Sequence, residues 1–381
     1  MGYSTRAVHA YPTIRKEKIM LFFIKKEPVL SAAALLAVVS MFFVHPSSEY
    51  LSYIDFRTLA LLFSLMTVVA GLKEIGLFRY LGSSLLAGLK STRQLALTLT
   101  ALCFFSSMLI TNDVSLITFV PFSVLILNMA GLPELLIPVI VLQTIAANLG
   151  SMATPIGNPQ NLYLYSTFGL SAGTLIRYML PLTVFSALLL VIAVFLLKNR
   201  PLSIDRTAME ESILPERSSL LFYLALFLVC LGCVVRIYSW HVMFLVVLAA
   251  VLVKDRTLFF RVDYFLLLTF VCFFVFIGNM NRFPPFREFV VNMIAGHEKV
   301  AAIGISQVIS NVPAALLLSN FTDQWEQLII GTNLGGLGTL IASMASLISY
   351  KQVAAEYPEK KGRYLAVFTW WNLLFLAVLI W

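Results

Sequence analysis

The stretch Asn148-Leu-Gly-Ser-Met-Ala-Thr-Pro-Ile-Gly-Asn-Pro-Gln-Asn161 lies inside an otherwise apolar segment, residues 135–167. Its prolines lack a backbone N–H and end helices, and its glycines allow turns and close backbone contacts. Backbone groups in lipid need internal hydrogen bonds, so irregular chain survives there only where protein buries it or where it lines a wet cavity. The stretch therefore predicts a transmembrane helix that is interrupted within the membrane.

The composition of the whole chain also indicates a membrane protein. Of its 381 residues, 60% are hydrophobic and 12% are charged, whereas soluble proteins average about 45–50% apolar and about 25% charged residues. A water-soluble globule of this composition could not cover itself with polar surface, which excludes soluble enzymes and disordered or fibrous proteins. The four cysteines lie in apolar segments and imply no disulfide framework.

Nine apolar segments are long enough, or nearly so, to cross a bilayer, which takes about 20 residues. Two further apolar stretches, Leu95–Ala130 and Val300–Asn320, carry a polar break in the middle and predict re-entrant hairpins. The predicted fold class is an all-α polytopic membrane protein. The nine segments are Val29–Val44, Phe56–Leu72, Leu135–Thr167 (interrupted), Leu175–Leu197, Leu220–Arg236, His241–Val253, Tyr264–Gly278, Gln327–Ser349 (interrupted) and Tyr364–Trp381.

The basic residues predict the orientation of these segments. The chain has 27 Lys and Arg against 19 Asp and Glu, a net charge of +8. With the N-terminus inside, 21 of the 27 basic residues fall on the inner side, as membrane proteins require of their cytoplasmic loops. We therefore expect a multi-pass protein of the cell (inner) membrane with a cytoplasmic N-terminus and an external C-terminus. Its positive charge needs no nucleic-acid partner.

The sequence contains an internal repeat. Asp55-Phe-Arg57 corresponds to Asp263-Tyr-Phe265, and Ile110-Thr-Asn-Asp113 to Ile309-Ser-Asn-Val312. The segment that begins at Asn148 corresponds to the segment Asn333-Leu-Gly-Gly-Leu-Gly-Thr339. An odd number of crossings separates the copies, so the second runs through the membrane upside down, as in secondary transporters.

This repeat divides the chain into four parts. A basic cytoplasmic arm, 1–28, with Met20 as an alternative start, precedes the first half. That half, 29–198, has its hairpin at 95–130 and its interrupted helix at 135–167. A cytoplasmic linker, 199–218, leads to the second half, 219–381, whose hairpin is 300–320 and whose interrupted helix is 327–349.

The polar breaks carry the chemistry of a binding site. The N-terminal end of a half-helix attracts an anion, whereas unwound carbonyl groups suit Na⁺. We therefore predict two related cation sites with an anion between them; simple helix kinks are the alternative. The predicted cation ligands are Thr111, Asn112, Asp113, Asn148, Gly150, Ser151 and Thr154, and then Ser310, Asn311, Thr332, Gly335 and Thr339. The predicted substrate contacts are Asn112, Thr154, Pro155, Asn158, Asn311, Val312, Pro313, Asn333 and Gly336.

Asp113 is the acidic residue that lies within an apolar stretch, while the other acids fall in loops or at span ends. An ionisable group at such a depth costs several kcal/mol and is functional by default. It can coordinate Na⁺ or carry a proton. The alternative role is to cap the second helix of the hairpin, which is common for Asp.

With these motifs the chain resembles the ion transporter superfamily, which includes divalent anion–sodium symporters, citrate permeases and arsenite efflux permeases. In the sodium symporter branch each hairpin tip carries Ser-Asn-Thr, whereas here the tips read Thr111-Asn112-Asp113 and Ser310-Asn311-Val312. Asp113 and the Asn-Pro-Gln-Asn stretch resemble the citrate and arsenite permeases instead. The resemblance implies an elevator-like motion and a homodimer. Only Ile19–Ile24 corresponds to Leu220–Arg236, so the first half has one crossing fewer.

We therefore expect a secondary active transporter of a small anion, either a carboxylate or an inorganic oxyanion, coupled to Na⁺ or H⁺ and free of other metals and cofactors. An arsenite efflux permease and a cation/proton antiporter are the alternatives within the superfamily. A channel, or a permease with a soluble ATPase partner, is a further class. An intramembrane enzyme would need paired catalytic groups, and a lone Asp does not supply them.

Overall fold

The computed structural model describes residues 27–86, 89–202 and 214–381. Nearly all of the predicted arm 1–28, including Met20 and Ile19–Ile24, lies outside the described residues, and so does most of the linker 199–218. The described chain is helical. Its sole β feature is an isolated bridge between Ser91 and Pro201.

The helices of the first half follow the predicted segments closely. They are α2 (Pro28–Ser40), α3 (Tyr50–Tyr53), α4 (Phe56–Glu74), α5 (Leu77–Leu86), α6 (Thr92–Ile110), α7 (Asn112–Met129), α8 (Leu136–Ser151), α9 (Pro159–Thr167) and α10 (Ala172–Phe195). The predicted interrupted helix 135–167 thus consists of α8 and α9, separated by the break 152–158. The short helix α3 has no counterpart among the predicted segments.

The second half is built from the same kinds of element. Its helices are α11 (Arg217–Val234), α12 (Trp240–Lys254), η2 (Arg256–Arg261), α13 (Tyr264–Asn281), α14 (Pro284–Ile294), α15 (Glu298–Ile309), α16 (Asn311–Leu318), α17 (Trp325–Leu334), α18 (Met344–Glu356), η3 (Pro358–Lys360) and α19 (Lys361–Leu379). The predicted interrupted helix 327–349 consists of α17 and α18, separated by the break 335–343. Helix α18 continues beyond the predicted end.

Seven segments among the described residues are long and apolar enough to cross a membrane: α4, α6, α7, α10, α11, α13 and the segment Pro358–Leu379. Helices α2, α8 and α12 are apolar but shorter. The chain is therefore a helical polytopic membrane protein, as its composition predicts.

The two predicted hairpins differ in size. In the first, α6 and α7 have 19 and 18 residues, and each has the length and composition of a membrane span. In the second, α15 and α16 have only 12 and 8 residues. The apolar length of 95–130 did not distinguish two crossing helices from a re-entrant pair, and the re-entrant arrangement stays a prediction.

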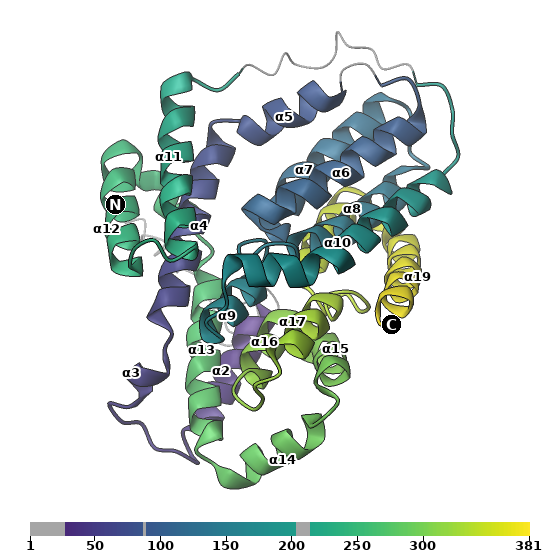
Figure 1. Cartoon of the computed structure of the whole chain (residues 1–381). Helices are drawn as coiled ribbons and strands as arrows, with labels where there is room; N and C mark the ends of the chain where they lie inside the picture. The colour runs from purple at the N-terminus through teal and green to yellow at the C-terminus, as the bar shows by residue number, and fades with distance from the viewer. Residues whose placement is uncertain (1–26, 87–88, 203–213) are drawn as a thin grey trace, which may run out of the picture.

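The helices form two groups (Figure 1). Helices α2, α4, α11, α12 and α13 pack together on one side, and α6–α10 pack with α15–α19 on the other. Helix α5 runs laterally from α4 to α6 and α7, and α14 runs laterally from α13 to α15. The lateral helices thus join the two groups in each half of the chain.

Matched N-caps begin the two long helices that precede the lateral ones. The carboxylate of Asp55 accepts a hydrogen bond from the N–H of Thr58 at 3.0 Å, and that of Asp263 accepts one from Leu266 at 2.9 Å. An Asp at this position satisfies one of the unpaired N–H groups at a helix start. Asp55 and Asp263, the first pair of corresponding positions in the predicted repeat, therefore both cap the start of a helix.

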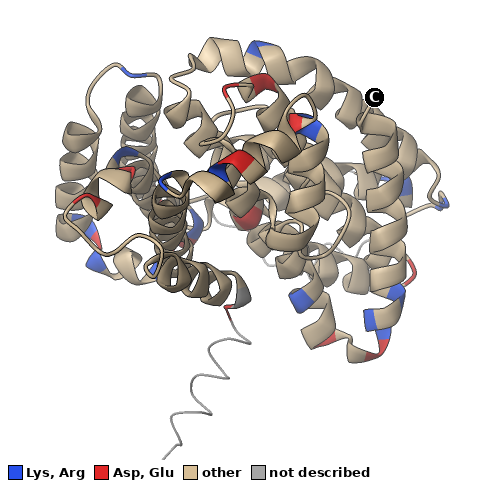
Figure 2. Ribbon diagram, turned by 90° about the horizontal axis from the view of Figure 1, so that it is seen from below, with Lys and Arg blue, Asp and Glu red and all other residues tan. Residues whose placement is uncertain are grey.

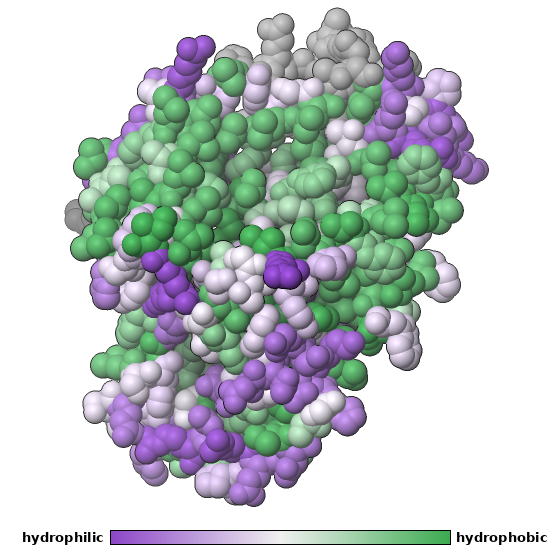
Figure 3. Space-filling model, in the orientation of Figure 1, coloured by the Kyte–Doolittle hydropathy of each residue, from purple (hydrophilic) through white to green (hydrophobic). Residues whose placement is uncertain are grey.

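Charge and hydropathy follow the layout of a membrane protein. Lys, Arg, Asp and Glu lie mostly at helix ends and in connections (Figure 2). Apolar side chains form a broad band over the middle of the molecule, and hydrophilic ones gather at its lower end and upper corners (Figure 3). Helices α10, α11 and α12 expose many large apolar residues, including Val184, Leu221 and Leu245, as lipid-facing helices do.

Candidate functional site

Both hairpins turn at a residue with an unusual backbone. Thr111, between α6 and α7, has φ 70° and ψ 151°, and Ser310, between α15 and α16, has φ 75° and ψ 154°. Among the described residues only one other non-glycine residue, Arg236, has a positive φ. Such a conformation costs about 1–3 kcal/mol and persists only where the surroundings impose it. The two tips therefore share one specific, strained turn.

Each tip is bound to the break of the neighbouring interrupted helix. The N–H of Asn112 donates to the carbonyl of Gly157 at 3.0 Å, and that of Asn311 donates to Ala342 at 2.9 Å. Asn112 corresponds to Asn311, and Gly157 corresponds to Ala342. The shift in residue number between the halves is the same for all hairpin pairs, and the broken helices have a constant shift of their own. In each half, the first N–H group of the helix after the strained turn thus donates to the unwound backbone of the break.

A second pair of contacts repeats the correspondence. The hydroxyl of Thr154 donates to the carbonyl of Met108 at 2.5 Å, and that of Thr339 donates to the carbonyl of Gln307 at 3.0 Å. Met108 and Gln307 lie on the incoming helix of each hairpin, at the same distance before the tip. Both predicted threonines therefore fix a break to a hairpin.

Glycine allows the hairpins and the broken helices to approach closely. A Cβ atom placed on Gly150 would lie 2.1 Å from the carbonyl oxygen of Phe104 and 2.8 Å from the hydroxyl of Ser107. A Cβ on Gly335 would lie 2.5 Å from the hydroxyl of Ser306. Gly150 and Gly335 were predicted as cation ligands; in the structure their absent side chains make room for the hairpin.

The breaks of the two halves meet in a cluster of buried amides and hydroxyls. Asn148, which is 4% exposed, accepts hydrogen bonds from the amide of Asn112 at 3.1 Å and from the hydroxyl of Ser343 at 3.0 Å. Its own amide donates to the carbonyl of Gly336 and to the hydroxyl of Ser346, both at 3.4 Å. Asn148 thus joins its own hairpin tip to the break of the second half.

A second amide chain crosses between the halves nearby. The amide of Asn158 donates to Asn333 at 2.9 Å and to the hydroxyl of Ser151 at 3.0 Å. The amide of Asn333 in turn donates to Asn161 at 2.6 Å. We call the set Asn112, Asn148, Ser151, Asn158, Asn161, Asn333, Ser343 and Ser346 the amide junction. All eight residues are buried, and each amide can both donate and accept, so the junction can contact a cation through oxygen or an anion through N–H.

Asp113 lies one residue beyond the junction and is partly buried. Its backbone N–H donates to the side chain of Asn112 at 3.0 Å. The first residue before α7 is Thr111, and no side chain caps that helix, so the capping role of Asp113 is not observed. The carboxylate remains available for an ion or a proton.

The remaining predicted residues lie around the junction without joining it. The hydroxyl of Thr332 donates to Leu328 in its own helix. Asn311 lies against Gly336, since a Cβ there would be 2.9 Å from the amide nitrogen of Asn311. Among the predicted substrate contacts, Pro155 is buried within the first break, and Val312 and Pro313 are buried at the start of α16. Thr339, a predicted cation ligand, is exposed.

Gln307 is a positioning residue that the sequence interpretation missed. Its amide donates to the carbonyls of Gly335 and Leu337, both at 3.0 Å, and its oxygen accepts from the N–H of Thr339 at 2.8 Å. It therefore holds the second break in its unwound form. A lone Gln within an apolar hairpin arm was the available signal. Asn161, Ser343 and Ser346 were also absent from the predicted site.

Membrane-length helices, two strained hairpin tips and a buried polar junction between broken helices define the class of the protein: it is a membrane transporter. The chain belongs to the citrate transporter family, which it matches over residues 19–324. The family is one of transporters, so the chain is not an enzyme.

Individual relatives agree with this assignment. The chain is 32% identical over 334 residues to the uncharacterized transporter MJ0456 of Methanocaldococcus jannaschii. The match covers 87% of this chain and 90% of the relative. It is 30% identical over 302 residues to the inner membrane protein YbiR of Escherichia coli strain K12, and this match covers 78% of this chain and 80% of the relative. A shorter match, 37% over 136 residues, relates 35% of this chain to 28% of the silicon efflux transporter LSI3 of Oryza sativa subsp. japonica.

Proposed function

We propose that this protein is a secondary active transporter that moves a small anion, a carboxylate or an inorganic oxyanion, with Na⁺ or H⁺. The observation that carries the proposal is the pair of tips at Thr111 and Ser310, which share one backbone conformation and contact corresponding breaks. Paired breaks of this kind supply N–H groups for an anion and carbonyl groups for a cation. The membership in the citrate transporter family supports anion transport.

The architecture of the proposal is an inverted repeat with a moving part. The matched caps, tips and threonine contacts support two copies of one unit, 29–198 and 219–381, in opposite orientations. The group α6–α10 with α15–α19 carries the amide junction, and the lateral helices connect it to the other group. We infer that this group moves across the membrane like an elevator, within a homodimer, with the N-terminus cytoplasmic and the C-terminus outside.

The proposed binding site consists of residues of the amide junction and of predicted residues around it, and it has three parts. Asn112, Asp113, Ser151 and Thr154 form the first cation site, and Ser310, Asn311, Thr332 and Thr339 form the second. Asn158 and Asn333 face the anion. Only the first site contains a carboxylate, because Val312 occupies the place of Asp113 in the second half. The two cation sites are therefore expected to differ in charge and in ion dependence.

Flux measurements test the coupling. The purified protein is placed in vesicles, and uptake of labelled citrate, arsenite and inorganic oxyanions is measured under imposed Na⁺ and pH gradients. We expect flux of at least one of these solutes to follow one gradient. Flux that ignores both gradients for every solute would contradict the proposal.

Asp113→Asn tests the role of the carboxylate, with Asp323→Asn as the matched control. Asp323 is an exposed acid in the loop between α16 and α17. Removing the charge at Asp113 is expected to abolish the ion dependence of transport, because the first cation site loses its only anionic ligand. The control is expected to retain it. Unchanged ion dependence in Asp113→Asn would remove the carboxylate from the coupling mechanism.

A second candidate function is proton-coupled efflux of a neutral hydroxylated solute. One observation favours it: no Lys, Arg or His belongs to the amide junction, and the acid beside it is Asp113, so the described site offers no fixed positive charge to an anion. The matching segment of a silicon efflux transporter agrees with this candidate. Flux of silicic or arsenous acid that follows the pH gradient while no charged oxyanion moves would favour it.

A further inference from the structure

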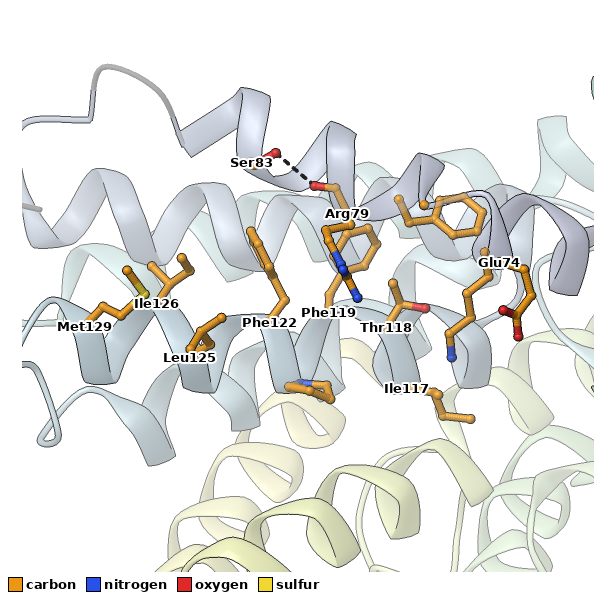
Figure 4. A pocket seen from close by; sticks show the side chains of 14 residues that line it. Glu74, Arg79, Ser83, Ile117, Thr118, Phe119, Phe122, Leu125, Ile126 and Met129 are labelled. Carbon is orange, nitrogen blue, oxygen red and sulfur yellow. Dashed lines mark hydrogen bonds between the residues drawn. The ribbon is translucent and has the colours of Figure 1, made fainter. Parts of the chain in front are cut away.

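A cavity of about 790 Å³ lies away from the amide junction, between the end of α4, the lateral helix α5 and the hairpin helix α7 (Figure 4). Helix α4 has 19 residues, so it is about 28 Å long, close to the roughly 30 Å thickness of a hydrocarbon core. Its C-terminal residues Lys73 and Glu74, which line the cavity, therefore lie at the level of lipid head groups.

The two ends of this cavity differ in chemistry. At the corner of α4 and α5 it is lined by Lys73, Glu74 and Arg79, and Arg79 reaches from α5 toward α7 in Figure 4. Along α7 its lining is apolar apart from Thr118 and ends at Met129. Leu125 on this wall is 56% exposed, a large apolar side chain that the protein itself does not cover.

The charged corner has an excess of positive charge. Glu74 forms an ion pair with Arg261 of η2 at 3.1 Å, so another cation already neutralises its carboxylate. Within the described ranges, no acid forms an ion pair with Lys73 or Arg79. Both side chains are exposed toward the cavity or its mouth. An anionic group in this corner would therefore gain two charge-assisted contacts.

We propose that the cavity binds an anionic phospholipid, with its phosphate at Lys73 and Arg79 and one acyl chain along α7. Basic pockets between transmembrane helices at head-group level are recognised sites for anionic lipids. A free anion would use the charged corner but leave the apolar wall uncovered, and a zwitterionic lipid would bring its own cationic group next to the two basic residues. The lipid would bridge α5 and α7, the joint between the two helix groups, so it is placed to affect their relative movement.

Lipid binding to the purified full-length chain tests the proposal. The protein in detergent is titrated with phosphatidylglycerol or phosphatidylcholine of identical acyl chains, and bound lipid is counted by native mass spectrometry. We expect Lys73→Gln/Arg79→Gln to weaken phosphatidylglycerol binding about 30-fold, which corresponds to about 1 kcal/mol for each basic residue, and to weaken binding of the zwitterionic phosphatidylcholine much less. The matched control is Lys351→Gln/Lys361→Gln, which removes the same charge from exposed residues outside the cavity.

Two further measurements separate a lipid from a free anion. Leu125→Trp fills the apolar wall while both cations remain, and it should weaken phosphatidylglycerol binding. Inorganic phosphate and glycerol phosphate should fail to displace the lipid at millimolar concentration. If the two double variants lose phosphatidylglycerol binding to the same extent, surface charge alone explains the effect, and the proposal is overturned. Displacement by inorganic phosphate, with no effect of Leu125→Trp, would overturn it in favour of a free-anion site.

Discussion

Asn333→Leu tests whether the amide junction holds the two halves together. Asn333 is 2% exposed; it accepts a hydrogen bond from Asn158, donates one to Asn161, and donates another to the carbonyl of Ile329 in its own helix. A leucine of similar size leaves the Asn158 donor and the Asn161 acceptor buried without this partner. Each such group costs about 1–3 kcal/mol, so we expect a loss of roughly 2–6 kcal/mol in the free energy of unfolding.

Asn372→Leu is the matched control. Asn372 on α19 is also buried, and it also donates to the carbonyl four residues earlier in its helix, that of Phe368. Its side-chain oxygen has no hydrogen-bond partner among the described residues, so leucine there leaves no other side chain unpaired. We expect this variant to be as stable as the parent or more stable.

Thermal unfolding of the two purified variants in the same detergent gives the comparison. Both substitutions add the same apolar side chain to a buried helical site, so the difference between their unfolding midpoints reports the contacts between the halves. A clear decrease for Asn333→Leu alone is the expected result. If both variants shift by the same amount, the contacts of Asn333 with Asn158 and Asn161 contribute nothing to stability, and the reasoning about the junction is wrong.

Two other variants probe the joints between hairpins and breaks. Gly150→Ala places a Cβ 2.1 Å from a backbone carbonyl of α6 and should prevent stable folding, seen as loss of the monodisperse peak in size-exclusion chromatography, whereas Gly304→Ala, which meets nothing within 4 Å, should leave it unchanged. Gln307→Leu removes three hydrogen bonds to the second break and should speed amide hydrogen exchange in 335–343 while exchange in 152–158 stays constant. Equal acceleration in both breaks would indicate general destabilisation.

The sequence predicted the helices and their interruptions well, because the cause of each interruption is local. Pro155 and Pro159 lack backbone donors, and the structure has its break at 152–158 between α8 and α9. The tip residues at 111 and 310 were likewise located from the polar residues that follow them. The inverted repeat stays a prediction, and it is supported by residues of the same type that have the same local role in each half, such as the caps at Asp55 and Asp263.

The partners of the polar residues could not be predicted, because they come from the other half of the chain. Asn158 and Asn333 form a hydrogen bond although they are 175 residues apart in the sequence, and nothing in either motif specifies the other residue as its partner. Gly150 shows a related limit: its role as a cation ligand stays a prediction, and its close contact with the hairpin backbone could not be predicted from the sequence. Gln307 was missed since a single amide in an apolar arm has no periodic pattern.

The atoms around the glycines near the two breaks determine whether these glycines can change during evolution. In the first half, a Cβ on Gly150 or Gly157 would strike main-chain atoms, at 2.1 and 2.0 Å. In the second half, a Cβ on Gly335 would meet the hydroxyl of Ser306 at 2.5 Å and the carbonyl oxygen of Gly331 at 2.7 Å, and Gly338 has a φ of +105°, which side chains rarely adopt. Exchanging a neighbouring side chain relieves neither a clash with main-chain atoms nor a positive φ. Related proteins are therefore expected to keep glycine at these positions in both halves.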